Sequence, residues 1–230
     1  LYLSSKENHE SQFFLGVIFS QGVEVPRNIN QAIHYYKEAS SFNHNYSKNN
    51  LAIIYKNGID TNKNIWYSIE LLQEAIKQKN DYISMYNLSH IYIYEEMSDK
   101  LDESIELLIK SSLNFEPSIG LLFISLIQKY KTINIEQIEK EVKKHKNFTE
   151  NDINKIVNDI FSYFEYNNID SDLYKNLYQS YQNIDYTYFI DYKAYQTNIF
   201  MNQKQKYNED NIDPKFNIND DFYDGFGINI

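Results

Sequence analysis

The chain has no cysteine among its 230 residues. It therefore has neither a disulfide framework nor a cysteine-ligated metal site, which excludes the disulfide-stapled kind of secreted repeat protein. Long hydrophobic runs are also missing. The longest, residues 119–127, contains Ser125, and it is far shorter than the roughly 18 apolar residues that a membrane helix requires. No signal peptide is visible, and these absences together slightly favour a cytoplasmic location.

Positive charge is scarce. The chain has 22 Lys and Arg against 32 Asp and Glu, which gives a net charge of −10. An acidic chain repels the phosphates of nucleic acids, so a nucleic-acid binder would need a local basic stripe. The short basic stretch at residues 140–146 is interrupted by Glu141 and is typical of a solvated helix face. The composition therefore disfavours nucleic acid as a partner.

Catalytic motifs are missing as well. The sequence has no phosphate-binding loop, no GxSxG and no HExxH. Its five histidines are scattered, and none of them has the spacing of a metal-ligand set. Residues 224–227 are glycine-rich but lack the flanking strand and helix of a nucleotide-binding loop. The sequence thus predicts a protein that is not an enzyme and that holds no cofactor and no metal.

What the sequence does contain is a repeating unit. Leu15-Gly16, Leu51-Ala52 and Leu88-Ser89 occupy the same two positions, first 36 and then 37 residues apart. Other positions keep the same spacing: Phe19, Tyr55 and Tyr92; Gly22 and Gly58; Ala32, Ser68 and Ser104; Ala39, Ala75 and Ser111. Self-similarity at this period is typical of stacked helical pairs. We therefore predict an all-α protein, an α/α solenoid of antiparallel helix pairs followed by a helical C-terminal segment.

Each unit consists of a predicted first helix, A, and a second helix, B, with apolar residues at helical spacing. The expected helices cover residues 9–20, 28–41, 46–57, 64–78, 82–94 and 101–113, with a degenerate fourth pair at 118–130 and 135–145. Gly16 leaves room for close helix approach. Gly22, Gly58 and Asn43 supply left-handed helix ends. Trp66 is expected to pin its helix to a neighbour.

The repeat pattern fades after Pro117. Thr149, with Asp152 three residues later, forms a capping-box variant that predicts another helix start. Further helices are predicted at residues 171–181 and 186–206. These boundaries divide the chain into a solenoid at 1–146, an additional helical segment at 149–207 and an acidic, Asn-rich, irregular tail at 208–230.

These residues resemble the Sel-one-like repeat, a relative of the tetratricopeptide repeat. The first unit supplies Leu15-Gly16, Phe19, Gly22, Ala32, Tyr35-Tyr36 and Ala39-Ser40, and the second supplies Leu51-Ala52, Tyr55, Gly58, Tyr67, residues 69–72 and Ala75. The match is good over residues 9–79, moderate to 114 and weak to 146. Tetratricopeptide units are shorter, at about 34 residues. The resemblance implies a right-handed superhelix that acts as a non-catalytic scaffold or adaptor and binds a protein or peptide.

The candidate partner-binding residues come from the outward side of the A helices. On a helical wheel, Leu15 and Gly16 face helix B, and Phe13 and Val17 fall on the opposite side. Equivalent positions in the next two units extend the set. The full set, which we call the A-helix row, is Phe13, Val17, Asn49, Ile53, Lys56, Tyr86, His90 and Tyr94. Because A helices usually line the concave face of a solenoid, we expect a groove for a peptide or a partner helix there.

Several alternatives stay open at this point. The row can instead be buried against the next repeat or covered by the C-terminal segment. If it is exposed, alanine changes weaken partner binding and leave stability nearly unchanged. The repeats can also serve as a regulatory module of a larger signalling protein such as a kinase, or as an RNA-binding helical repeat, which the net charge disfavours. Leu3-Ser4 stand 36 residues before Ala39-Ser40, so we expect the chain to begin inside an earlier repeat.

Overall fold

The structure is a computed structural model that describes residues 9–22, 25–77, 81–95, 97–130 and 135–167. All of these residues belong to one unit, Leu1–Ile190. Within the described ranges every regular element is a helix. The predicted helices at 171–181 and 186–206 and the tail at 208–230 lie outside the described residues.

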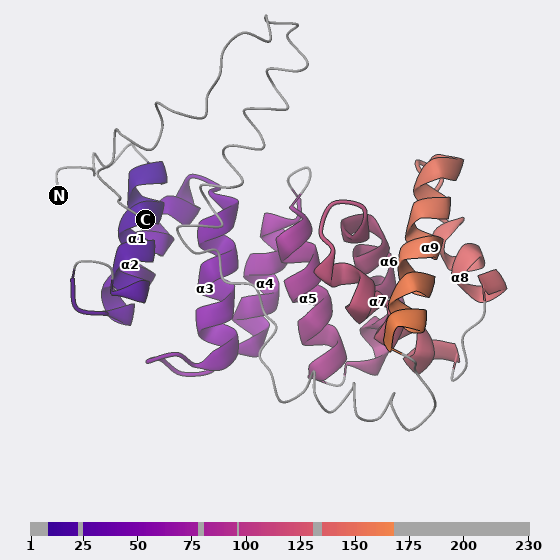
Figure 1. Ribbon diagram of the computed structural model, residues 1–230. Coiled ribbons are helices and arrows are strands. Elements are labelled where there is room, and N and C mark those ends of the chain that lie inside the picture. Colours follow the sequence, from indigo (N-terminus) through magenta and orange to yellow (C-terminus); the bar gives the residue numbers. More distant parts are fainter. Residues whose placement is uncertain (1–8, 23–24, 78–80, 96, 131–134, 168–230) are drawn as a thin grey trace, which may run out of the picture. The chain divides into compact units, whose positions relative to one another are not determined.

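The helices follow the order that the repeat predicts (Figure 1). Their bounds are α1 His9–Gln21, α2 Ile29–Ser41, α3 Asn45–Asn57, α4 Ile65–Ala75, α5 Tyr82–Tyr94, α6 Leu101–Ser112, α7 Pro117–Tyr130, α8 Ile135–Val142 and α9 Glu150–Asn167, with a 3-10 turn, η1, at Ser98–Lys100. Most ends agree with the prediction to within one residue. The largest departures are α4 and α8, which end earlier than expected.

Helix pairs pack one after another along the chain. The A helices α1, α3 and α5 each pack most extensively against the B helix that follows, and each B helix then contacts the next A helix. This alternation is the packing of an α/α solenoid, so the predicted fold class is confirmed. The fourth pair departs from it, because α9 packs against both α7 and α8.

Asparagine side chains cap the N-terminal ends of the first two B helices, α2 and α4. The Asn28 side chain accepts a hydrogen bond of 3.1 Å from the backbone N–H of Gln31, and Asn64 accepts one of 3.0 Å from Tyr67. The two residues are 36 apart and hold the same repeat position. An amide oxygen at this place satisfies one of the N–H groups that the first helical turn leaves without a partner. The same position therefore begins helix B in both repeats.

Left-handed residues end helices at the predicted places. Gly58, the C-cap of α3, has a φ of 65°, and Gly22 has a φ of 76°. Asn43, just after α2, has a φ of 60°. Glycine adopts this region without steric cost, and asparagine is the side chain that tolerates it best. The predictions for all three residues are confirmed.

Replacing Gly58 by alanine is expected to lower the free energy of unfolding by about 1 kcal/mol, because the added Cβ disfavours a positive φ. The Cβ would also lie 3.1 Å from the backbone nitrogen of Lys63. The matched control is Gly58→Asn, which keeps the left-handed preference that Asn43 shows in the same chain. Thermal unfolding of both variants tests the prediction, and equal losses would contradict it.

Loops of successive repeats are joined by a recurring ion pair. Arg27 Nη1 lies 3.1 Å from Asp60 Oδ2, and Lys63 Nζ lies 3.1 Å from Glu95 Oε1. The two basic residues are 36 apart. Glu95 holds the repeat position of Gly22 and Gly58 in the third repeat. The connection to helix B of that repeat contains η1. Exposed pairs of this kind stabilise little individually, at most about 1 kcal/mol.

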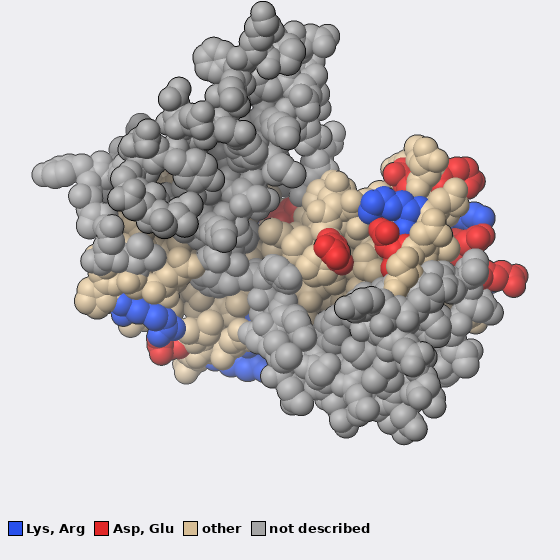
Figure 2. Space-filling model, viewed as in Figure 1, with Lys and Arg blue, Asp and Glu red and all other residues tan. Residues whose placement is uncertain are grey.

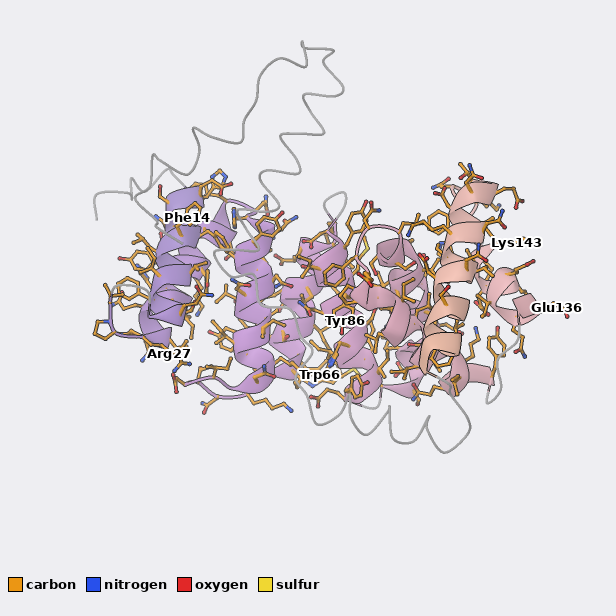
Figure 3. All side chains as sticks on the ribbon, in the orientation of Figure 1. Phe14, Arg27, Trp66, Tyr86, Glu136 and Lys143 are labelled. Atoms are coloured by element: carbon orange, nitrogen blue, oxygen red, sulfur yellow. The ribbon has the colours of Figure 1, made fainter. Side chains whose placement is uncertain are left out.

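The prediction for Trp66 is wrong. Its side chain, which Figure 3 labels, is 75% exposed on α4, so it does not pin that helix to a neighbour. Single exposed apolar side chains are common on protein surfaces. Trp66 instead marks the solvent side of a B helix.

A and B helices are buried to different extents. In α2 the buried residues are Ile29, Ala32, Tyr36 and Ala39, a single stripe at helical spacing. In α5, by contrast, every residue from Tyr86 to Ile93 is buried, and in α7 every residue from Ser118 to Leu126 is buried. A helix that is buried all round lies in the interior of a protein. The A helices are therefore interior elements, and the B helices present one side to solvent.

Candidate partner-binding site

The structure buries the A-helix row. Seven of its eight residues have exposed fractions of 8% or less, and Phe13 and Asn49 are fully buried. Tyr94 is half-buried. The wheel placed these residues outside the core because it assumed one buried side per helix, whereas the A helices are buried on all sides. A partner-binding role for the row stays a prediction, and of the alternatives that the sequence left open, burial of the row is the one that the structure shows.

Burial also changes what alanine substitutions are expected to do. Tyr86 is 1% exposed, and truncating a buried aromatic ring to alanine costs about 3–5 kcal/mol. The expectation that such changes leave stability unchanged therefore does not hold for Tyr86. Tyr94, which is half-buried, is the residue of the row best suited to a binding test.

In the first repeat, Phe13 lies in an aromatic cluster that joins two helix pairs. Its ring centroid is 4.8 Å from that of His44, 5.9 Å from Tyr36 and 6.1 Å from Tyr46. Tyr36 belongs to α2, whereas the other two residues belong to the start of α3. Aromatic pairs at these separations stabilise beyond the area that they bury. Phe13 thus helps to hold the second repeat on the first.

In the third repeat, Tyr86, His90 and Tyr94 form a continuous aromatic strip along α5, where Figure 3 labels Tyr86. The ring centroids of Tyr86 and His90 are 6.2 Å apart, and those of His90 and Tyr94 are 4.4 Å apart. Tyr86 also packs edge-on against Phe115, at 5.4 Å. Positions four residues apart share one side of a helix, which is why the strip forms.

A buried chain of hydrogen bonds crosses all three repeats, and sequence reasoning missed most of it. Asn49 Oδ1 accepts from Asn87 Nδ2 at 2.8 Å and from Ser84 Oγ at 3.3 Å, which ties α3 to α5. Asn49 Nδ2 donates to the neighbouring Asn50 Oδ1 at 3.4 Å. Asn50 Nδ2 in turn donates to the hydroxyl of Tyr36 in α2 at 3.2 Å.

The chain of hydrogen bonds ends in the first repeat, where Ser20 Oγ and the Tyr36 hydroxyl lie 3.1 Å apart. Burial raises the pKa of Tyr36, so the residue acts as a neutral hydroxyl. One signal for this chain of hydrogen bonds was present in the sequence. Asn50 and Asn87 are 37 residues apart and hold the same position of the repeat, so they form a recurring polar residue on an otherwise buried helix.

Replacing Asn49 by alanine is expected to lower the free energy of unfolding by about 1–3 kcal/mol, because buried donors on α5 lose their shared acceptor. The control is Asn57→Ala on the exposed end of the same helix, which is expected to change stability by less than about 0.5 kcal/mol. Urea unfolding monitored by circular dichroism measures both. A loss at Asn49 no larger than that at Asn57 would show that the chain of hydrogen bonds is energetically unimportant.

Charged side chains in the described ranges are mixed in sign. On the face that Figure 2 shows, the described Lys and Arg side chains lie among Asp and Glu rather than in a basic stripe. No three His, Asp or Glu side chains within the described ranges come together as a metal site requires. None of the described helices is long and apolar enough to cross a membrane.

The family model for the Sel1 repeat matches residues 9–41 and 45–80. The first match covers α1 and α2, and the second covers α3 and α4. These two units of the chain therefore match the Sel1 repeat. The resemblance inferred from Leu15-Gly16 and its equivalents is therefore confirmed. Sel1 repeats are generally protein-interaction modules.

Two solved structures are similar to this chain in fold. One is a protective antigen present in uropathogenic Escherichia coli strains that displays an SLR fold, with 22% identity, a TM-score of 0.50, and coverage of 60% of this chain and 30% of the other. The second is a Sel1 repeat protein from Oxalobacter formigenes, with 16% identity, a TM-score of 0.47, and coverage of 61% and 59%. The chain thus spans less than two thirds of either relative. No curated protein matches its sequence.

Proposed function

We propose that this chain is a non-catalytic scaffold or adaptor that binds a peptide or protein partner through the A-helix row. The composition of the row carries the proposal. Aromatic and aliphatic side chains such as Phe13, Ile53 and Tyr86 alternate with the hydrogen-bonding side chains of Asn49, Lys56 and His90. Partner segments need apolar anchors for affinity and polar groups for orientation, and the row supplies both.

Tyr94→Ala tests the proposal. It removes a half-buried ring at the end of the row. Trp66→Ala is the matched control, because it removes an exposed ring from a B helix. Both tagged variants are used to retain partners from lysate of the source cells, after thermal unfolding shows that they are folded. We expect Tyr94→Ala to lose a protein partner that Trp66→Ala keeps.

The opposite pattern, in which Trp66→Ala loses the partner, would place the site on the B-helix side. Retention of RNA that falls steeply as salt is raised would contradict a protein-binding scaffold. A regulatory role within a larger signalling protein is the second form of this proposal. In that form the retained partner is a catalytic domain.

A further inference from the structure

The A helices are covered on two opposite sides. Leu15, which faces helix B, is 6% exposed, and Val17, on the other side of α1, is 0% exposed. The B helices bury the side of each A helix that carries Leu15 or its equivalent. The backbones of successive A helices approach one another at few points, although Asn49 joins α3 to α5. Packing between A helices therefore does not by itself account for a row that is buried from α1 to α5.

A helix that follows the repeats belongs to the same hydrophobic cluster as the third-repeat end of the row. One hydrophobic cluster contains Tyr86 and Ile93 of α5, residues of α7, and Ile153, Ile156, Val157 and Ile160 of α9. Tyr94 packs against the same cluster. The four α9 residues form the stripe of an amphipathic helix. The end of the row at Tyr86 and Tyr94 is thus linked through α7 to a cluster that receives a helix from the C-terminal side of the chain.

The next predicted helix carries a similar stripe. Leu173, Tyr174, Leu177, Tyr178 and Tyr181 recur at helical spacing within residues 171–181, and Tyr186, Tyr188, Phe189 and Ile190 follow. A short amphipathic helix gains most of its stability from packing its apolar side against another element. Tyrosine suits a surface of mixed character, because its ring is apolar and its hydroxyl forms hydrogen bonds.

The row has that mixed character. Its aromatic residues match tyrosine rings, and Asn49, Lys56 and His90 place polar groups among them. Residues 171–190 begin four positions after α9 ends at Asn167, so they follow directly on the helix that the cluster already holds. We infer that residues 171–190 of the same chain dock on the A-helix row as an intramolecular cover. This inference rests on the proposed function in one respect, that an external partner competes with the cover.

Photo-crosslinking in the full chain tests the inference. Tyr94 is replaced by the photoreactive benzoylphenylalanine, which keeps a ring at a half-buried position, and the control carries it in place of the exposed Trp66. We expect irradiation to join position 94 to a peptide from residues 171–190 within one molecule, and position 66 to none of it. Crosslinks from position 94 only to residues 9–167, to residues beyond 190 or to a second copy would overturn the inference.

Thiol labelling gives a second readout, because the chain has no cysteine of its own. His90→Cys reports on the row, and Leu51→Cys, at a fully buried core position, reports on folding. When Leu173 and Leu177 are both replaced by aspartate in the full chain, we expect labelling at position 90 to become at least about tenfold faster while position 51 stays protected. Continued protection of both positions would show that the repeats themselves bury the row.

The two proposals fail in different ways. If position 94 crosslinks to residues 171–190 but Tyr94→Ala keeps every partner, the cover stands and the binding face lies elsewhere. If Tyr94→Ala loses a partner but no crosslink to 171–190 forms, the binding face stands and the inference of a cover is wrong.

Discussion

Gly16→Ala is expected to lower the free energy of unfolding by about 2–3 kcal/mol, although alanine is normally the better helix former. A Cβ at Gly16 would lie 2.5 Å from Cδ1 and Cε1 of Tyr36 and 3.0 Å from its Cγ. The Tyr36 ring has little freedom to move. It is fully buried, and hydrogen bonds to Ser20 and Asn50 fix its hydroxyl. The clash therefore outweighs the gain in helix propensity.

The second repeat suggests a rescue. Ala52 and Leu72 hold the positions of Gly16 and Tyr36, 36 residues later. The double variant Gly16→Ala/Tyr36→Leu copies this pair into the first repeat. We expect it to be more stable than the sum of the two single changes predicts, as a double-mutant cycle from urea unfolding would show. Strict additivity would mean that Gly16 is not required for the approach of Tyr36.

The second large effect is expected at Glu141, a buried carboxylate that joins α7 and α8. Its Oε1 accepts a hydrogen bond from Lys129 Nζ at 2.9 Å and one from the Tyr130 hydroxyl, and its Oε2 lies 2.6 Å from Lys144 Nζ. Burial alone raises the pKa of Glu141, but the hydrogen bonds from two lysines and a tyrosine outweigh it and lower the pKa to about 2. The side chain is thus held as an anion.

Glu141→Gln is expected to lower the free energy of unfolding by about 2 kcal/mol at pH 7, because Lys129 and Lys144 lose the counter-charge of the buried carboxylate. The direction in which this stabilisation changes with pH follows from the lowered pKa of Glu141. The contribution of the carboxylate is complete above its ordinary value of 4.5 and is lost as pH falls from there to about 2. The difference between wild type and variant therefore shrinks in that interval.

Urea unfolding at pH 7, 5 and 3 measures this difference. The control is Glu139→Gln on the same helix, where the carboxylate pairs with Lys143 at 2.8 Å on the exposed side. Exposed pairs of this type contribute less than about 1 kcal/mol, so we expect a small change at every pH. A loss for Glu141→Gln that is the same at pH 3 as at pH 7 would contradict the assignment.

Local features of the fold were predictable because each depends on one residue type. Gly16 was expected at a close helix approach, and the Tyr36 ring lies where that predicts. Gly58 and Asn43 were expected in left-handed conformations, which glycine and asparagine tolerate best. The Thr149–Asp152 capping box is also present, with Thr149 N–H donating to Asp152 Oδ2 at 2.8 Å and Asp152 N–H donating to Thr149 Oγ1 at 3.2 Å.

The candidate site was less predictable because it depends on what lies outside each helix. A wheel separates two sides of α1 but does not show that Val17 is buried as completely as the core. His44 caps α3 by accepting from the Ser47 N–H at 3.2 Å, although histidine is not among the usual caps. Buried polar partners such as Asn49 and Asn87 meet only when repeats stack, and no single helix pattern reveals that.

The hydrogen bonds from Tyr36 through Asn50 and Asn49 to Asn87 have a consequence for cooperativity. In a solenoid, each unit contacts only its neighbours, and terminal units can fray independently. Here the unfolding of α2 removes the Tyr36 hydroxyl, to which Asn50 donates a hydrogen bond. Asn50 in turn accepts a hydrogen bond from Asn49, the amide that joins α3 to α5. Fraying at the first unit is therefore penalised in the second and third. Amide hydrogens of α1 to α5 are expected to exchange as one block rather than in steps from the N-terminal side.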